Sequence, residues 1–279
     1  MPPTPHVRKA GKGPAVICLH SSASSSGQWR GLMDLLSDRF EVVAPDLYGA
    51  GRTAAWSQAR PMALDDEAAL LAPLFEAAGD GVHLVGHSFG GAVALRAAYA
   101  HRRRLASVVL YEPVLFSVLM ALAPVRAAAT EISAVRDDTT RLVEERRLLE
   151  SAQRFVDYWL GEHSWTALPE ERKAALATAM PSVIEEWHAA FHEPLPLRTL
   201  ASIDVPTLIL TGSRSTAAAR AVASLLSSAL PRAEIREVEG VGHMAPVTHP
   251  DTINPLIEAF LVGHLRSMPP TATMPGNPP

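Results

Sequence analysis

The residues best suited to chemistry lie in one pentapeptide, Gly86-His87-Ser88-Phe89-Gly90. It stands between an apolar run at 82–85, which predicts a strand, and a run at 91–100, which predicts a helix. A serine flanked by small residues at a strand-to-helix turn is the pattern of a nucleophile elbow. Glycine has no Cβ, so the two glycines let the chain pass close to itself at such a turn. The pattern predicts Ser88 as a nucleophile, and the alternative is that Ser88 only caps the following helix.

A serine hydroxyl is a weak nucleophile at neutral pH, so it needs a base within hydrogen-bond reach and a third group that orients the base. His243 is our candidate for the base, because it lies on a glycine-containing loop after the last predicted strand. His87 is adjacent to Ser88, but neighbouring residues on a sharp turn point apart. His20 follows another strand and is expected to order the loop that it begins.

A substrate pocket and a metal site have weaker signals. Four residues are expected to line a pocket: His20, His87, Trp159 and Trp187. The alternative for the two tryptophans is the core, where aromatic residues at helical spacing usually lie. His188 and His192 have the i, i+4 spacing of a shared metal ligand pair, but the sequence offers no third ligand. We therefore predict no metal and no cofactor.

Strands and helices alternate around the pentapeptide. Apolar runs predict strands at 6–9, 15–19, 40–44, 82–85, 107–111, 207–211 and 233–238. Helical spacing predicts helices between them, including one that Asp65 caps and Gly79 ends, one at 217–230, and a final one that begins near Pro250. This order predicts an α/β fold with a mostly parallel central sheet and helices on both faces.

The alternation stops between residues 114 and 194. Only helical patterns occur there, at 115–122, 139–160 and 169–191, the last broken near Pro181. An all-helical insertion between two strands predicts a cap over the C-terminal edge of the sheet, where open α/β sheets bind ligands. The chain is thus expected to comprise a discontinuous core (1–113 and 196–266), a helical cap (114–195) and a proline-rich, disordered tail (267–279).

Composition excludes several classes of protein. A hydrophobic content of 48% with 19% charged residues is that of a folded chain, and a net charge of -4 gives no basic surplus for nucleic acid or anionic lipid. The N-terminus lacks the pattern of a secretory signal, and no run has the length of a membrane span. The single cysteine, Cys18, is in an apolar strand and is expected to be a buried, inert thiol. We expect a cytoplasmic enzyme of unknown oligomeric state, with no nucleic-acid or membrane partner.

These segments together resemble the α/β-hydrolase superfamily from about His6 to Arg266. The resemblance is carried by His20-Ser21-Ser22, Pro45-Asp46-Leu47-Tyr48-Gly49-Ala50-Gly51-Arg52, the pentapeptide 86–90 and Gly242-His243. It implies an oxyanion hole formed by the backbone N–H groups of Phe89 and Ser22. Many relatives have His-Gly where this chain has His20-Ser21, so Ser21 is the alternative donor.

The acidic residue departs from the common pattern of the superfamily. There, an aspartate follows the strand that corresponds to 207–211, in the motif Gly-x-x-Asp. This chain reads Gly212-Ser213-Arg214-Ser215 and has no Asp or Glu between Val205 and Pro231. Glu112 follows the strand after the elbow helix, a position from which some members, including certain haloalkane dehalogenases, supply the acid. The order Ser88, Glu112, His243 also keeps the order nucleophile, acid, histidine.

Glu112 has an alternative role, and two other carboxylates, Asp46 and Asp204, lie near strand ends. Glu112 alternatively caps the next segment or pairs with an arginine of the cap. Asp46 is expected to brace its own loop, and Asp204 lies at the wrong end of its strand.

The expected activity is hydrolysis of a small ester or related acyl compound through a Ser-His-Glu triad and an acyl-enzyme, as in a carboxylesterase. A serine at the elbow argues against epoxide-hydrolase and haloalkane-dehalogenase chemistry, which use a carboxylate nucleophile. Hydrolysis of a C–C bond in a β-diketone and perhydrolysis use the same triad and remain alternatives. A small-molecule receptor that does not turn over is the alternative from another class.

Overall fold

The computed structural model describes residues 2–120 and 126–265. Within these residues, seven strands form one sheet in the order β1-β3-β2-β4-β5-β6-β7. The strands are β1 (Val7–Ala10), β2 (Ala15–Leu19), β3 (Glu41–Pro45), β4 (Val82–His87), β5 (Leu105–Tyr111), β6 (Thr207–Gly212) and β7 (Ala233–Val238). Only β1 runs antiparallel to its neighbour, so the predicted mostly parallel sheet is confirmed.

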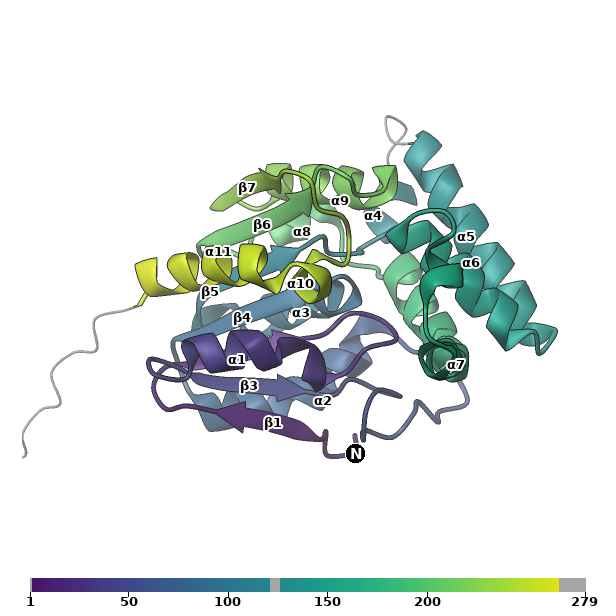
Figure 1. Cartoon of the computed structure of the whole chain (residues 1–279). Helices are drawn as coiled ribbons and strands as arrows, with labels where there is room; N and C mark the ends of the chain where they lie inside the picture. The colour runs from purple at the N-terminus through teal and green to yellow at the C-terminus, as the bar shows by residue number, and fades with distance from the viewer. Residues whose placement is uncertain (1, 121–125, 266–279) are drawn as a thin grey trace, which may run out of the picture.

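Helices cover both faces of the sheet (Figure 1). One face packs against α1 (Arg30–Leu36), which follows a short 3-10 turn (Ser26–Trp29), and against α11 (Pro250–Gly263). The other face packs against α2 (Leu64–Ala78), α3 (Phe89–His101) and α9 (Ala217–Ala229). Because both faces are covered, every residue of β2, β4, β5 and β6 is buried, which explains their unbroken apolar runs.

Further helices connect β5 to β6. They are α4 (Ser117–Met120), α5 (Arg126–Glu144), α6 (Leu148–Leu160), a 3-10 turn (Ser164–Ala167), α7 (Glu170–His192) and α8 (Leu197–Leu200). We call α4 to α7 the inserted helices. Figure 1 shows α5, α6 and α7 gathered at one end of the sheet. The division of the chain into core and cap stays a prediction, and the tail at 267–279 lies outside the described residues.

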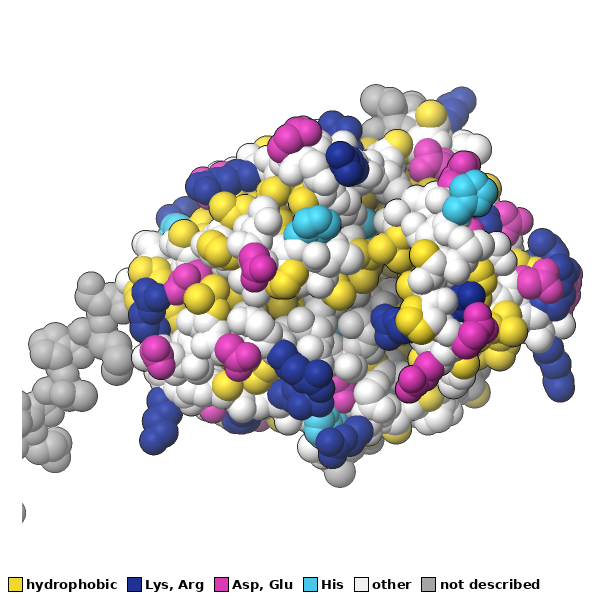
Figure 2. Space-filling model, viewed as in Figure 1, with side chains coloured by type: hydrophobic (Ala, Val, Ile, Leu, Met, Phe, Trp, Pro, Cys, Tyr) yellow, Lys and Arg dark blue, Asp and Glu magenta, His cyan; other side chains and the backbone are white. Residues whose placement is uncertain are grey.

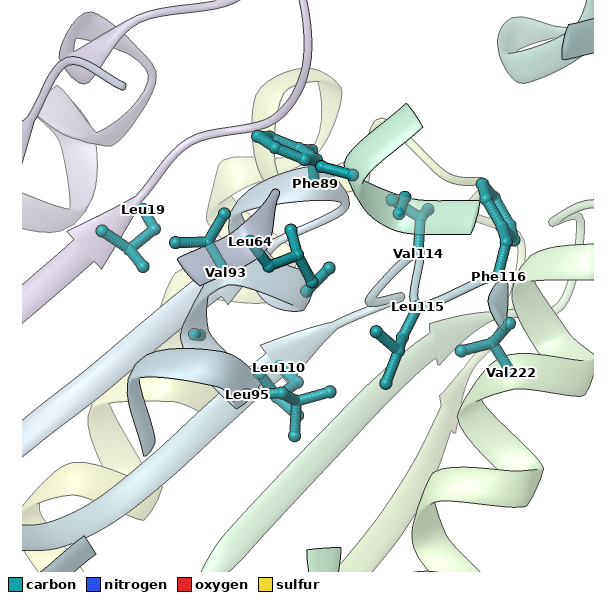
Figure 3. Close-up of a cluster of buried hydrophobic side chains, with 14 of the residues drawn as sticks. Leu19, Leu64, Phe89, Val93, Leu95, Leu110, Val114, Leu115, Phe116 and Val222 are labelled. Atoms are coloured by element: carbon teal, nitrogen blue, oxygen red, sulfur yellow. The ribbon is translucent and has the colours of Figure 1, made fainter. Parts of the chain in front are cut away.

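The core runs without a break from the sheet into the inserted helices. Figure 3 shows Val93 and Leu95 of α3 among Leu19 of β2 and Leu110 of β5. The same cluster continues through Phe116, which follows β5, to the aromatic side chains of α6 and α7. The inserted helices are therefore packed onto the sheet by apolar contact.

Three expected helix boundaries differ from the structure. Asp65 does not cap α2: the helix begins at buried Leu64, and the Asp66 side chain accepts a hydrogen bond of 2.9 Å from the Ala63 N–H. The helix predicted at 139–160 is instead two, since the chain turns between α5 and α6 with Arg146 at a φ of 60°.

α7 continues through Pro181 instead of breaking there. Proline removes one backbone hydrogen bond, but Met180 and Val183 on either side are buried in the core and hold the helix together.

Two other expectations concern single residues and the membrane. Gly79 ends α2 with a φ of 73°, as predicted. Cys18 is fully buried, and burial raises the pKa of its thiol, which confirms its expected burial. Over the ranges 2–120 and 126–265, no helix has the length and apolar character needed to cross a membrane.

Candidate active site

Ser88 occupies the turn between β4 and α3. Its backbone has a φ of 56° and a ψ of -119°, a strained conformation for a residue with a side chain. A Cβ on Gly86 would lie 2.5 Å from the carbonyl oxygen of Gly90, and one on Gly90 would clash with the carbonyl oxygens of Leu19 and His20. The turn therefore needs both glycines, as the pentapeptide predicts.

Three predicted residues meet at the C-terminal edge of the sheet. His243 Nε2 lies 2.9 Å from Ser88 Oγ, and His243 Nδ1 lies 2.7 Å from Glu112 Oε2. Ser88 follows β4, Glu112 follows the adjacent β5, and His243 stands on the loop after β7. The imidazole and the carboxyl are both buried, with 2% and 0% of their surface exposed. Strands that run parallel end at the same edge, and this is why residues so distant in sequence come together.

Glu112 is held by four donors. Its Oε1 accepts hydrogen bonds from the Thr211 hydroxyl (3.0 Å), the Gly212 N–H (2.7 Å) and the Ser215 hydroxyl, and its Oε2 accepts one from His243. Burial by itself would raise the pKa of Glu112, but His243 and these donors outweigh burial and hold the pKa below its ordinary value. The group is therefore an ionised carboxylate at neutral pH.

Ser215 stands where the common pattern has its aspartate, and here it donates to Glu112. The side chains of Glu112 and Ser215 therefore lie in contact, and of the two only Glu112 carries a charge. No arginine is among the hydrogen-bond partners that the described residues give Glu112.

The His243 loop is fixed by two buried side chains. The Tyr111 hydroxyl donates to the Gly242 carbonyl oxygen (2.8 Å), and His87 Nε2 donates to the His243 carbonyl oxygen (2.8 Å). His87 Nδ1 accepts in turn from Gln28 (3.1 Å). Burial, followed by the nearby His243 ring, lowers the pKa of His87 well below its usual range, so His87 is neutral. His87 was expected on the pocket wall, but it lies behind the wall with 0% of its surface exposed and supports His243 from there.

His20 also lies behind the pocket wall. It is fully buried, its Nδ1 donates to the Ser21 carbonyl oxygen (2.8 Å), and its Nε2 accepts from the Leu47 N–H (3.0 Å). Burial lowers its pKa. Its position agrees with the expected role in ordering the loop and differs from the expected place on the wall, because both ring nitrogens are engaged by backbone.

The neighbouring loop offers one free donor beside Ser88. The Ser21 N–H donates to Gln28 Oε1 (3.1 Å) and is therefore occupied. Among the described residues, the N–H groups of Ser22 and Phe89 have no hydrogen-bond acceptor, and both residues line a cavity that includes Ser88. Phe89 is the first residue of α3, where backbone N–H groups have no partner within the helix.

Two cavities meet at Ser88. The larger, of about 230 Å³, has Ser88 and His243 on the sheet side and Phe155, Trp159 and Leu176 on the inserted helices. Trp159 stacks on His243 with ring centroids 3.9 Å apart. Figure 2 shows the surface hollowed where the inserted helices meet the rest of the chain, with hydrophobic side chains along one edge.

The smaller cavity, which we call the chamber, shares Ser22, Ser88, Phe155 and Trp159 with the larger one. It extends toward α7, where Trp187 and Glu186 form part of its wall. Trp159 and Trp187 thus lie where a pocket-lining role needs them, while both are also buried against the core.

Comparison with known proteins shows the family to which this chain belongs. Residues 16–256 match the model of the alpha/beta hydrolase family. The chain belongs to the alpha/beta hydrolase family. The chain is 29% identical over 261 residues to the "Putative carbamate hydrolase RutD" of Pantoea ananatis, covering 88% of this chain and 87% of that one. It is 28% identical over 269 residues to polyketide synthase ThaQ of Burkholderia thailandensis, of which it spans only 12%.

Among solved structures, an esterase from Thermogutta terrifontis has the same fold, with a TM-score of 0.72 at 21% identity, over 93% of this chain and 94% of the esterase. The family and its named hydrolase relatives identify this alpha/beta hydrolase as an enzyme.

Two residues that line the cavities of this alpha/beta hydrolase, Phe155 and Glu186, were not predicted from the sequence. Phe155 is one helical turn before Trp159 and shares its face, so the i, i+4 spacing on α6 was a usable signal. Glu186 carried no signal, because in sequence it is one of two adjacent glutamates in a charged helix.

The paired histidines of α7 do not form part of this site. The rings of His188 and His192 stack with centroids 4.3 Å apart, and His188 Nδ1 lies 3.2 Å from the Met62 carbonyl oxygen. In the part of the chain that the structure describes, no three His, Cys, Asp or Glu side chains gather as a metal-binding group.

Proposed function

We propose that the protein is a serine hydrolase that cleaves esters of small acyl groups through an acyl-enzyme. The observation that carries the proposal is the hydrogen-bonded series from Ser88 through His243 to Glu112, with Ser88 on a strained turn that opens into an apolar cavity. A serine hydroxyl needs such a base and such an orienting acid to attack a carbonyl carbon at neutral pH. The hydrolase family and the relative named as a carbamate hydrolase support acyl chemistry.

In the proposed first step, Ser88 Oγ attacks the acyl carbon while His243 Nε2 takes its proton. Glu112 keeps the other ring proton on Nδ1 and stabilises the imidazolium that forms. The N–H groups of Phe89 and Ser22 donate to the developing oxyanion, and the N-terminus of α3 adds its positive end. His243 then protonates the leaving alcohol.

In the second step, His243 deprotonates a water molecule that attacks the acyl-enzyme, and the acid product leaves as Ser88 recovers its proton. Trp159, stacked on His243, covers the imidazole on its cavity side. Excluding bulk water in this way strengthens the electrostatic interactions within the site.

The test is a rapid-mixing assay with 4-nitrophenyl acetate. We expect a burst of nitrophenol in the wild type, equal to the enzyme concentration, because the acyl-enzyme accumulates. Ser88→Ala is expected to abolish the burst and to retain the fold by circular dichroism. Ser37→Ala, at the end of α1, is the control and should keep both the burst and the fold. Hydrolysis that continues unchanged in Ser88→Ala would refute the proposal, whereas a wild type that shows neither a burst nor turnover would favour a receptor.

A further inference from the structure

Gln28 is a polar side chain beside the active site to which the proposed mechanism gives no role. It stands on the 3-10 turn Ser26–Trp29, which is fixed in place because Trp29 is buried in the core. Its side chain is on the wall of the larger cavity, together with Ser88 and His243. A side chain that starts from a fixed turn is able to hold neighbouring groups in place.

The oxygen of the Gln28 amide holds the loop that contains Ser22. Gln28 Oε1 accepts from the Ser21 N–H (3.1 Å) and from the Ser21 hydroxyl (3.0 Å). His20 Nδ1 holds the other end of Ser21, because it donates to the Ser21 carbonyl oxygen (2.8 Å). That carbonyl and the Ser22 N–H belong to one planar trans peptide unit and point in opposite directions. The two contacts together therefore fix the direction of the Ser22 N–H, which is a proposed donor to the oxyanion.

The nitrogen of the same amide reaches the other half of the site. Gln28 Nε2 donates to His87 Nδ1 (3.1 Å), and His87 Nε2 donates to the His243 carbonyl oxygen (2.8 Å). His87 is fully buried, and its ring centroid lies 5.3 Å from that of His243. One side chain thus contacts the oxyanion loop directly and reaches the loop of the proposed base through a single histidine.

The two ends of this series determine which atoms donate within it. The Ser21 N–H only donates, so the amide must present its oxygen there and its NH2 group to His87. An NH2 group also only donates, so His87 Nδ1 accepts and the ring proton is on Nε2. That proton meets the His243 carbonyl oxygen, which only accepts. The series therefore runs in one direction, from one backbone N–H to one backbone carbonyl oxygen.

We propose that Gln28 is a positioning residue that couples the oxyanion loop to the loop of the base. Through Ser21 it directs the Ser22 N–H. Through His87 it holds the backbone of His243. The proposal rests on the proposed esterase function and adds the residue that keeps the two halves of its machinery in place. A displacement of about 1 Å lowers a rate by a factor of about 10², so the loss of both contacts should slow acylation.

The test measures the rate constant of the nitrophenol burst from 4-nitrophenyl acetate at pH 6 and at pH 9. Gln28→Met keeps a side chain of similar length and removes both contacts, so we expect the rate constant to fall about 10- to 100-fold at both pH values. Gln153→Met is the matched control: the same change at an exposed position on α6 should keep the wild-type rate constant.

Gln28→Glu makes the contact with His87 depend on a proton. The new carboxylate still accepts from the Ser21 N–H, but it has no hydrogen to donate to His87 Nδ1. One proton shared between this carboxyl and His87 restores the series, because a protonated carboxyl presents an oxygen and an O–H in place of the oxygen and the NH2 group. We therefore expect Gln28→Glu to keep most of the wild-type rate constant at pH 6. At pH 9 it should fall further below the wild type, while remaining above Gln28→Met.

Other titratable groups near Gln28 are common to the wild type and both variants. Among the described residues, those that face His87 or share a cavity wall with Gln28 are His20, Tyr111, Arg172, Glu186 and His243. None of them is changed in these variants, so the readout is the rate constant of each variant divided by that of the wild type at the same pH. A difference between Gln28→Glu and Gln28→Met in this ratio belongs to the group at position 28.

A burst in Gln28→Met as fast as that of the wild type would overturn the proposal. Equal losses in Gln28→Met and Gln28→Glu at pH 6 would also overturn it, because they would mean that Gln28 only fills space. Thermal unfolding shows whether each variant is folded. If Gln28→Met does not fold, Gln28→Glu carries the test, and a ratio to wild type that is the same at pH 6 and pH 9 would overturn the proposal. In each case a wild-type burst that depends on Ser88 leaves the proposed esterase function standing.

Discussion

Replacing Glu112 by glutamine changes one atom of the site and leaves its shape. Glu112 Oε1 accepts from the Gly212 N–H at 2.7 Å, a backbone donor that cannot turn to accept. The glutamine must therefore keep its oxygen at that position and place its NH2 group where Oε2 was, against His243 Nδ1. Two donors then face each other, and His243 is driven to the tautomer with its proton on Nε2, the atom that must accept from Ser88.

The expected cost follows from this loss of the base. In a hydrolase triad, the wrong tautomer lowers kcat by a factor of about 10⁴, which corresponds to about 5.5 kcal/mol of activation free energy. Ser215→Ala removes one of the three donors to Oε1 but leaves the charge and the His243 contact, so we expect a loss of less than about tenfold.

The assay is steady-state hydrolysis of 4-nitrophenyl acetate by both variants, with circular dichroism and thermal unfolding to confirm that each is folded. The reasoning holds if Glu112→Gln loses about three to four orders of magnitude in kcat and Ser215→Ala keeps most of its activity. The reasoning would be contradicted if folded Glu112→Gln had activity near that of the wild type, or if Ser215→Ala lost more activity than Glu112→Gln.

Two further predictions concern stability. Gly86→Ala places a Cβ 2.5 Å from the Gly90 carbonyl oxygen, so we expect the free energy of unfolding in urea to fall by about 1–3 kcal/mol and the activity to fall with it. Gly263→Ala is the control, because the space around Gly263 is open, and its stability should equal that of the wild type. Equal stability of the two variants would contradict this prediction. Glu186 has a folded pKa of about 8, raised from its ordinary value of 4.5, so between these two values the unfolded chain loses its proton first and stability falls as pH rises. Glu186→Gln removes this dependence, and its stability relative to wild type, measured by urea unfolding from pH 5 to 8, should increase with pH; a constant difference would show that Glu186 ionises normally in the folded protein.

The alternation of strands and helices, and the turn at Ser88, were predictable because their causes are local. Fully covered parallel strands need unbroken apolar runs, and a strained turn needs glycine at Gly86 and Gly90, so both constraints are visible in residue types. The absence of any acid between Val205 and Pro231 was equally visible, and it directed the prediction to Glu112.

Helix boundaries within the inserted helices were harder to predict, because propensity competes with packing. Pro181 is a helix breaker by its chemistry, yet α7 passes through it, since buried Met180 and Val183 are worth more than one lost hydrogen bond.

Residue types and their order along the chain therefore determined the fold class and the candidates Ser88, Glu112 and His243. The tertiary structure decided which polar groups are free. Gln28 occupies the Ser21 N–H and so leaves Ser22 as the donor beside Ser88. Backbone partners place His20 behind the pocket wall, and burial distinguishes Glu186 from its neighbour Glu185. Whether a polar group has a partner depends on contacts between segments far apart in sequence, and no local pattern records them.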